Sequence, residues 1–268
     1  MAREGIEKPT ATPEFGKTAS AYAVHRLGFP VSMYDRWALL GLLPAGSGKA
    51  LDMGTGTGTI ARTLASMGHK VTATDIDAEM LETARSLASK QQLEINFLQR
   101  PSENTGLDGK QFDFITAGQC WHWFDRRAAA LEAHRLLKPS GMMMICHFDW
   151  LPLPGNIVEG TEKLILNYNP DWKASGGTGI YPAWFGDLAG GEFTNIQSFS
   201  YDEGAPYSQE AWVGRIEASA GIAMLPAEKR AAFKLELAAY LKQTYGGAAL
   251  MVPHRVFCVW GHKNQAAI

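Results

Sequence analysis

The sequence predicts an α/β fold, a doubly wound and mostly parallel sheet of seven strands that carries a helical, aromatic-rich lid. Short apolar runs alternate with amphipathic helical patterns between residues 49 and 148. Strands separated by helices of this length imply right-handed crossovers and a parallel sheet. The alternation ends there, and of the 12 Phe, 8 Trp and 8 Tyr residues, twelve fall between Phe148 and Trp212. This aromatic excess marks an insertion that should cover the ligand-binding edge of the sheet.

The strands are expected where short apolar runs end at turns. They cover residues 50–53, 71–74, 95–98, 112–117, 141–148, 193–201 and 252–260. The fifth run contains three consecutive methionines, which is typical of a strand buried on both faces.

Five helices are expected where apolar residues recur at helical spacing. They cover residues 57–67, a segment after Asp77, residues 125–138, residues 208–220 and a segment that starts near Pro226. Asp77 and Asp125 can accept hydrogen bonds from the first N–H groups of their helices. Gly68 and the run Pro139-Ser140-Gly141 are stop signals.

These patterns divide the chain into a core and a lid. Residues 1–150 are expected to hold N-terminal helices and a cofactor-binding core. Residues 151–191 and 206–248 should form the lid over the acceptor, and residues 192–205 and 249–268 should complete the sheet.

Charge and composition exclude several classes of protein. The 268 residues include 25 Lys+Arg and 27 Asp+Glu, for a net charge of −2, which argues against nucleic-acid binding. No apolar run reaches the length of a membrane span, and the polar N-terminus is unlike a signal or transit peptide. Three widely spaced cysteines with no CxxC motif indicate neither a disulfide framework nor a metal site. We therefore expect a cytoplasmic protein that binds neither membrane nor nucleic acid.

A glycine-rich loop follows the first strand, in the run Leu51-Asp-Met-Gly-Thr-Gly-Thr-Gly58. Its glycines allow a sharp turn and let the backbone approach a ligand closely, and free N–H groups at the following helix start can face that ligand. Asp75 ends the second strand, the position that binds ribose hydroxyls in such folds. Together these features predict a nucleoside-containing cofactor.

Spacing distinguishes two such cofactors. The dinucleotide fingerprint has glycine at its first, third and sixth positions, but the sixth position here is Thr59. Asp52 precedes the loop, where its carboxylate would oppose a pyrophosphate but suit a cationic ligand. The sequence therefore favours S-adenosylmethionine over NAD.

The chain resembles a class I S-adenosylmethionine-dependent methyltransferase with a Rossmann-like fold. The resemblance runs through LDMGTGTGT, VTATDIDAEMLETAR, FDFITAGQCWHWFD and HRLLKPSGMMMI. The "HWFD" element is similar to that of small-molecule methyltransferases of the trans-aconitate type. Two departures are the threonines Thr55 and Thr57, which replace commoner small or acidic residues, and Ser140, where the turn usually has glycine.

The resemblance implies a set of cofactor-binding residues. The glycine loop would cradle the methionine part, Asp75 would bind the ribose, and Ile76 and residues 100–103 would contact the adenine. The expected cofactor-binding residues are Asp52, Gly54, Thr55, Gly56, Gly58, Asp75, Ile76, Met80, Ser102, Glu103 and Gln119. An N-terminal helix should fold over the cofactor, with Tyr22 as a catalytic candidate and Arg26 paired with the cofactor carboxylate.

Methyl transfer requires alignment of acceptor and donor above all, and a general base only where the acceptor is protonated. Residues 118–125 follow the fourth strand at the carboxyl edge of the sheet, where ligands bind in open α/β folds. His122 is the leading candidate for a base or acceptor-positioning group. The alternative is a histidine that donates one hydrogen bond to a loop carbonyl. His147, at the end of the fifth strand, is a second choice.

The lid supplies the acceptor-binding candidates. Tyr181 is a catalytic candidate, and the expected substrate-binding residues are Trp184, Tyr207, Trp212, Arg215 and Ser219. Spacings of three and four place Trp212, Arg215 and Ser219 on one helical face. Aromatic rings with an arginine suit a planar or apolar acceptor that carries an anionic group, although each ring alone could also be a core residue.

Four functions agree with the sequence to different degrees. The first is transfer of a methyl group to a small-molecule acceptor. The second is an enzyme that consumes S-adenosylmethionine without methylation, such as a cyclisation that releases methylthioadenosine. The third is a non-catalytic binder, and the fourth, an NAD-dependent reductase, is disfavoured by Thr59 and Asp52. Fold alone does not choose among them.

Overall fold

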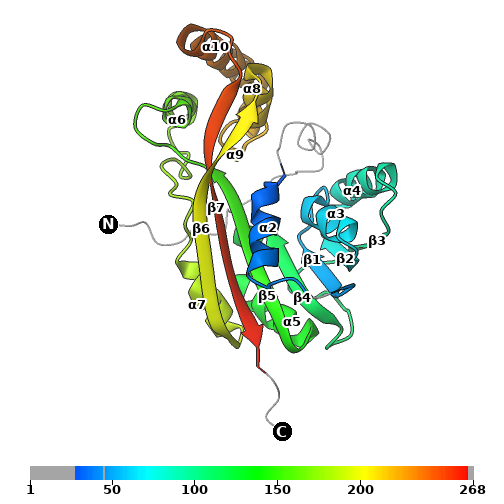
Figure 1. The fold of residues 1–268 in the computed structure, drawn as a ribbon. Helices are drawn as coiled ribbons and strands as arrows, with labels where there is room; N and C mark the ends of the chain where they lie inside the picture. The colour runs from blue at the N-terminus through cyan, green and yellow to red at the C-terminus, as the bar shows by residue number, and fades with distance from the viewer. Residues whose placement is uncertain (1–27, 45, 265–268) are drawn as a thin grey trace.

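The predicted sheet is present. The computed structural model describes residues 28–44 and 46–264, and its seven strands lie in the order β3-β2-β1-β4-β5-β7-β6 (Figure 1). The strands are β1 Lys49–Met53, β2 Lys70–Asp75, β3 Ile95–Gln99, β4 Phe112–Gly118, β5 Leu137–Trp150, β6 Phe193–Tyr207 and β7 Leu250–Lys263. The first five are parallel, and β7 runs antiparallel to both β5 and β6. The strand order reverses between β1 and β4, so the carboxyl ends of these two strands form the switch point where ligands bind in such sheets.

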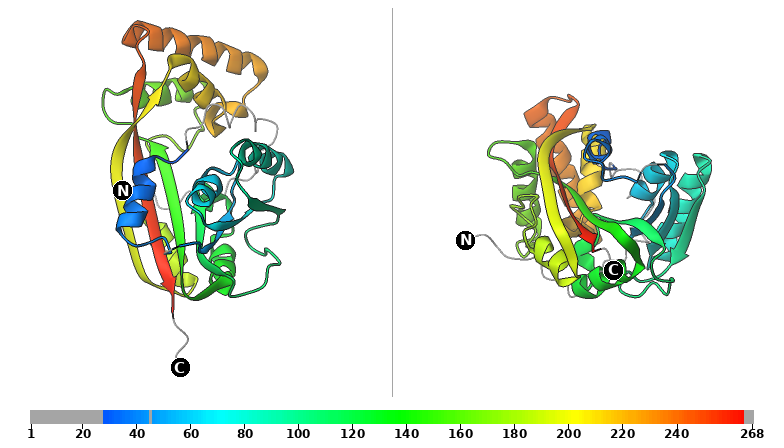
Figure 2. Two further views of the ribbon diagram at one scale, coloured as in Figure 1. Left: turned by 45° about the vertical axis from the view of Figure 1, so that its right-hand side comes forward. Right: turned by 60° about the horizontal axis from the view of Figure 1, so that its bottom comes forward.

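Helices lie on both faces of the sheet (Figure 2). They are α2 Val31–Leu39, α3 Thr59–Ser66, α4 Ala78–Lys90, α5 Arg126–Leu136, α6 Ile157–Tyr168, α7 Ala183–Gly190, α8 Gln209–Glu217, α9 Ala220–Ala223 and α10 Ala227–Tyr245, with a short 3₁₀ helix η2 at Trp121–Trp123. None of the described helices is both long and apolar enough to pass through a membrane.

Strand β5 is buried on both faces, as its methionines predict. Met142, Met144 and Cys146 pack in one core cluster with α2 and α3. Met143 and Ile145 point the other way, into a cluster with α5 and α7. Alternate residues of a strand face opposite sides, so this one strand contributes to both cores.

The start of β5 corrects one predicted boundary. The helix expected to reach Lys138 ends at Leu136, and β5 begins at Leu137 and continues through the expected stop signal. Ser140 adopts φ 64°, and the pairing with β4 is irregular between Phe112 and Phe114. A bulge therefore accommodates Pro139 within a strand, which the turn residues alone did not suggest.

The lid is helical, as expected, but its organisation differs in detail. Helix α6 occupies part of a segment for which no helix was predicted, and β6 extends to Tyr207 rather than Tyr201. Helices α6, α8, α9 and α10 pack on one another beyond the end of β5 (Figures 1 and 2). Their shared core contains Ile165, Trp212, Ile216, Phe233 and Leu237. The long pair β6–β7 carries this lid on the sheet.

Candidate functional site

The glycine loop connects β1 to α3 at the switch point. Gly54, Gly56 and Gly58 have φ angles of 61°, 55° and 80°, a region that residues with side chains rarely adopt. A side chain on Gly54 would lie 2.7 Å from Phe124 and 2.8 Å from Cys120, whereas one on Gly56 would meet nothing within 4 Å. The loop therefore packs against the segment after β4 on one side and leaves open space at Gly56.

Asp75, at the carboxyl end of β2, holds this loop. Its Oδ2 accepts the N–H of Gly56 at 2.8 Å, and its Oδ1 accepts the N–H of Asp77 at 3.0 Å. Burial raises the pKa of the carboxyl, although these hydrogen bonds oppose the shift. Each oxygen keeps a second lone pair for a ribose hydroxyl. Ile76, next in the chain, is 59 % exposed and could cover an adenine ring.

Asp52 lies beneath the loop. Its side chain is 2 % exposed, and it accepts the hydroxyl protons of Thr55 at 2.6 Å and Thr116 at 2.7 Å. Burial raises its pKa to about 6, against the hydrogen bonds that lower it. Asp52 thus joins the loop to β4, and direct contact with the cofactor remains a prediction.

The raised pKa of Asp52 predicts a measurable pH dependence. The folded chain takes up the proton more readily than the unfolded chain, so this residue lowers stability as the pH rises from the usual 3.8 through about 6. In chemical denaturation of the ligand-free protein, Asp52→Asn should gain about 3 kcal/mol relative to the wild type between pH 4 and pH 7.

Asp113 provides the control for this measurement. Partial burial raises its pKa, but hydrogen bonds from Lys138 and the Lys49 N–H lower it overall. The stability that Asp113 contributes is therefore present above its usual pKa and lost as the pH falls, so Asp113→Asn should show the opposite sign. A difference between Asp52→Asn and wild type that does not vary with pH would contradict the role given to Asp52.

The segment after β3 lies beside Asp75. The N–H of Arg100 donates to the Asp75 carbonyl at 2.9 Å. Ser102 is buried, and Glu103 accepts the N–H of Asp125 at 2.8 Å. The side chain of Met80 is buried at the start of α4, whose first turn is capped by Asp77. The predicted adenine-binding elements thus meet at one edge of the sheet.

Gln119 and His122 follow β4 at the same edge. Gln119 has φ 61°; its N–H donates to the Cys146 carbonyl at 2.9 Å and its amide donates to the Phe148 carbonyl. The ring of His122, in η2, lies 4.9 Å from that of Trp123 and 5.5 Å from that of His147. The two histidines considered from sequence are therefore neighbours.

Tyr181 brings a second group to this edge. Its hydroxyl donates to the Asp149 carboxylate and lies 3.2 Å from His147 Nδ1, and its ring stacks on Trp184 at 4.1 Å. His147 Nδ1 is 2.9 Å from Asp149 Oδ2. Asp149 was missed in the sequence, although a residue two positions after His147 on a strand faces the same side.

The remaining lid candidates gather in a different cluster. Trp212 is fully buried and its Nε1 donates to Thr161 at 3.1 Å, while its ring contacts those of Trp150 and Tyr207. The guanidinium of Arg215 lies 4.9 Å above the Trp150 ring. Burial lowers the pKa of Arg215, and the charges of Tyr207 and Asp149 partly offset this.

One spacing argument is wrong. Helix α8 ends at Glu217, and Ser219 is extended before α9, so it does not continue the helical face of Trp212 and Arg215. Its hydroxyl donates to the Ile216 carbonyl at 2.6 Å. Trp184 also packs in the α5–α7 core, apart from Trp212. Tyr22 and Arg26 lie outside the described residues.

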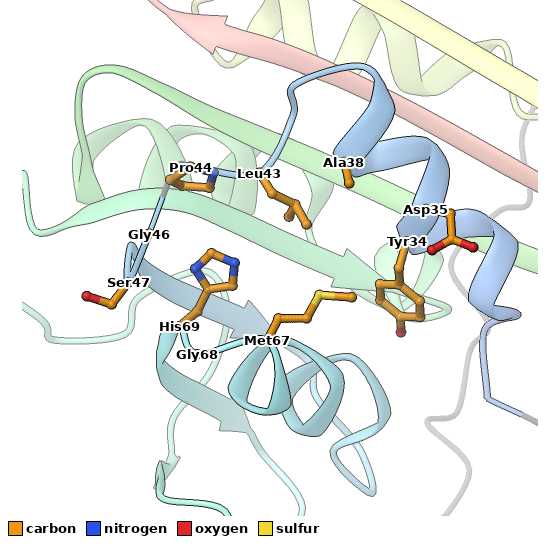
Figure 3. A pocket seen from close by; sticks show the side chains of 10 residues that line it. All are labelled: Tyr34, Asp35, Ala38, Leu43, Pro44, Gly46, Ser47, Met67, Gly68 and His69. Atoms are coloured by element: carbon orange, nitrogen blue, oxygen red, sulfur yellow. The ribbon is translucent and has the colours of Figure 1, made fainter.

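A surface depression lies at the opposite end of the strands. It has a volume of about 620 Å³ and is formed where α2 approaches the turns that precede β1 and β2 (Figure 3). Tyr34, Met67 and His69 line it. Because it lies at the amino ends of the strands, it is not the predicted cofactor site. Within residues 28–44 and 46–264 there is no group of three or more His, Cys, Asp or Glu side chains suited to a metal ion.

Residues 51–145 match the family model described as a methyltransferase domain. An uncharacterised methyltransferase of Mycobacterium tuberculosis is 35% identical over 129 residues, which are 48% of this chain and 49% of that protein. A malonyl-[acyl-carrier protein] O-methyltransferase of Enterobacter lignolyticus is 31% identical over 140 residues, or 52% and 53% of the two chains. The chain spans about half the length of these curated relatives.

Solved structures share the fold over most of the chain. A protein of Anaeromyxobacter dehalogenans, assigned provisionally as a type II methyltransferase, has a TM-score of 0.65 at 20% identity and covers 90% of this chain and 99% of its own. A Haemonchus contortus phosphoethanolamine N-methyltransferase, solved with S-adenosylhomocysteine, has a TM-score of 0.55 at 18% identity, covering 93% and 58%. A [4+2]-cyclase has a TM-score of 0.59 at 15% identity, covering 98% and 100%.

These comparisons show that residues 51–145 are similar in sequence to methyltransferase domains. The matched segment contains the glycine loop, Asp75 and the residues after β4. The lid lies outside it.

Proposed function

We propose that the protein transfers the methyl group of S-adenosylmethionine to a small-molecule acceptor. The observation that carries the proposal is the bond between Asp75 Oδ2 and the Gly56 N–H, which joins the acid after β2 to the glycine loop after β1. It places a carboxylate with spare lone pairs beside backbone that is open at Gly56. A ribose and a methionine chain fit these two neighbouring features.

Different parts of the chain would bind the cofactor and orient the acceptor. The glycine loop and Asp75 would hold the cofactor, with Ile76 over its adenine. The bound donor supplies an electrophilic methyl group on a sulfonium sulfur. The protein's own contribution is to orient an acceptor against that methyl, from the segment after β4 and from the lid.

The side chains of the lid favour an acceptor that has an apolar body and an anionic group. The guanidinium of Arg215 forms no ion pair within 4.0 Å among the described residues, and it lies over the Trp150 ring. A planar anion could pair with it and pack on the neighbouring aromatic rings. The "HWFD" element supports membership of the small-molecule branch that includes trans-aconitate-type enzymes.

A second function is compatible with the fold. A [4+2]-cyclase shares this architecture over nearly the whole chain, so the fold does not by itself require methylation. The second candidate is an enzyme that consumes S-adenosylmethionine without methylation, with release of methylthioadenosine.

An incubation of the protein with S-adenosylmethionine alone separates these functions. We expect no turnover without an acceptor, and S-adenosylhomocysteine only when an acceptor panel is added, both measured by chromatography. Methylthioadenosine formed without an acceptor would overturn the methyltransferase proposal. Binding of the cofactor with no turnover across the panel would favour a non-catalytic binder.

A further inference from the structure

Asp149 and His147 form a hydrogen-bonded pair on one face of β5. They are two residues apart on the strand, so both project to the side of α7. The His147 side chain is 5 % exposed, and its Nδ1 lies 2.9 Å from Asp149 Oδ2. The Tyr181 hydroxyl donates to the same carboxylate. A carboxylate accepts and does not donate, so Nδ1 of His147 carries the proton in this arrangement.

The other ring nitrogen of His147 is then the one with the free lone pair. Nε2 is buried and has no hydrogen-bond partner among the described residues. Burial of an unpaired polar atom destabilises the fold, and a hydrogen-bond donor on a ligand would offset that cost. A buried histidine with Nδ1 held by a carboxylate and Nε2 left to accept a proton is the arrangement of a general base.

The charged and titratable groups around the pair come from several elements. Burial would raise the pKa of Asp149, but the charges of His147 and His122 and the bonds from His147 and Tyr181 keep that pKa well below its usual value. Three of these groups interact with the pair directly: Tyr181, His122 on η2 and Arg215 on α8. Two further charged groups lie on the neighbouring elements, Arg255 on β7 in an ion pair with Asp202, and Asp187 on α7 in an ion pair with Arg126. Arg255 and Asp187 are thus each paired with a group of opposite charge.

We propose that Asp149 orients His147 and that Nε2 of His147 removes the proton from the methyl acceptor, so the acceptor carries a weakly acidic hydroxyl of the phenol or enol class. This inference rests on the proposed function and names its substrate class. A carboxylate acceptor is already ionised at neutral pH and needs no base. A phenol has a pKa near that of tyrosine, about 10, so it is protonated at neutral pH. A base that removes this proton therefore accelerates its methylation.

The reaction balances with one proton released. The acceptor O–H bond breaks and its proton moves to Nε2 of His147. The oxygen forms a bond to the methyl carbon as the carbon–sulfur bond breaks, and the sulfur keeps that electron pair. His147 then passes the proton to water, while Asp149 stays ionised and Arg215 can hold an anionic group elsewhere on the acceptor.

The first test needs no acceptor. Side-chain ¹⁵N NMR of histidine-labelled protein, with the His147 signals assigned from His147→Gln, should show Nδ1 protonated and Nε2 unprotonated when the ring is neutral. Asp149→Asn should weaken the preference for this tautomer, and the matched control His134→Gln, in α5, should leave the His147 signals unchanged. The opposite tautomer in the wild type would overturn the proposal.

The second test uses hydroxybenzoates and hydroxycinnamates, which carry a hydroxyl and a carboxylate on one molecule. Mass spectrometry should find the methyl on the hydroxyl oxygen. Asp149→Asn and His147→Gln should each reduce kcat by about 100-fold at neutral pH with KM little changed. The loss should shrink at high pH, because there the hydroxyl ionises in solution. A merely structural role would not produce that pH rescue.

The outcomes separate this inference from the proposed function. Methyl esters as products, or variants with the wild-type pH profile, would overturn the base assignment while methyl transfer still stood. Absence of S-adenosylmethionine binding in calorimetry would instead overturn the proposed function. If none of these probes is methylated although the cofactor binds, the tautomer measurement alone decides.

Discussion

Replacing Asp75 with alanine is expected to weaken S-adenosylmethionine binding by about 30-fold or more, which corresponds to about 2 kcal/mol. The change removes the hydrogen bonds proposed to the ribose, and it also removes the acceptor of the Gly56 N–H, which Asp75 Oδ2 now holds at 2.8 Å. The glycine loop would lose its link to β2. Isothermal titration calorimetry with S-adenosylmethionine measures the effect directly.

Asp108→Ala is the matched control for that measurement. Asp108 is an exposed acid between β3 and β4 whose carboxylate accepts only the Gln111 amide among the hydrogen bonds of the described residues. It should leave cofactor affinity unchanged, with the same loss of one negative charge. If Asp75→Ala binds the cofactor as tightly as the control does, Asp75 is not a cofactor ligand.

Replacing Trp212 with alanine should lower the free energy of unfolding by about 3–5 kcal/mol. The Trp212 side chain is fully buried in the lid core. Its removal leaves a cavity beside Trp150 and Tyr207, and the Thr161 hydroxyl loses the Nε1 donor while it still donates to the Ile157 carbonyl. Urea denaturation monitored by circular dichroism gives this value.

Two further variants serve as controls for this stability measurement. Trp212→Phe keeps most of the buried volume and should lose much less stability, while Phe185→Ala, a partly exposed aromatic of α7, should have a small effect. A Trp212→Ala protein as stable as wild type would contradict the assignment of Trp212 to the lid core. Reduced acceptor turnover with unchanged stability would instead support the substrate-binding role expected from its sequence.

The strands and the core helices α3, α4 and α5 could be predicted because their signals are local. Each of the five parallel strands is a short apolar run, and each of these three helices has apolar residues at helical spacing. Helices α2 and α7, which also pack in the core, were not predicted. Helix α6 was missed because its sequence lies between Pro-rich and Gly-rich turns, although Asn156 accepts the Glu159 N–H as its cap. The end of α5 was misplaced because Pro139-Ser140-Gly141 forms a bulge in β5 rather than a turn.

The candidate site could be predicted only in part. The glycine loop and Asp75 follow directly after strands that lie side by side, so their meeting follows from topology. Asp52 is predicted from sequence to contact the cofactor, and the structure adds that its carboxylate accepts two threonine hydroxyls, one of them Thr116 of β4. That contact joins residues 64 positions apart and has no signal in the sequence.

The sequence by itself determined the fold class and the glycine-rich turn after β1, because strand patterns, helix caps and glycine turns depend on neighbouring residues. The tertiary structure alone decided which lid residues meet which strand. It placed Tyr181 on the His147–Asp149 pair and Arg215 over Trp150. These partners are far apart in the chain, and they meet because the long β6–β7 pair and the lid helices pack beyond the carboxyl end of β5. Side chains brought together by packing leave no periodic trace in sequence.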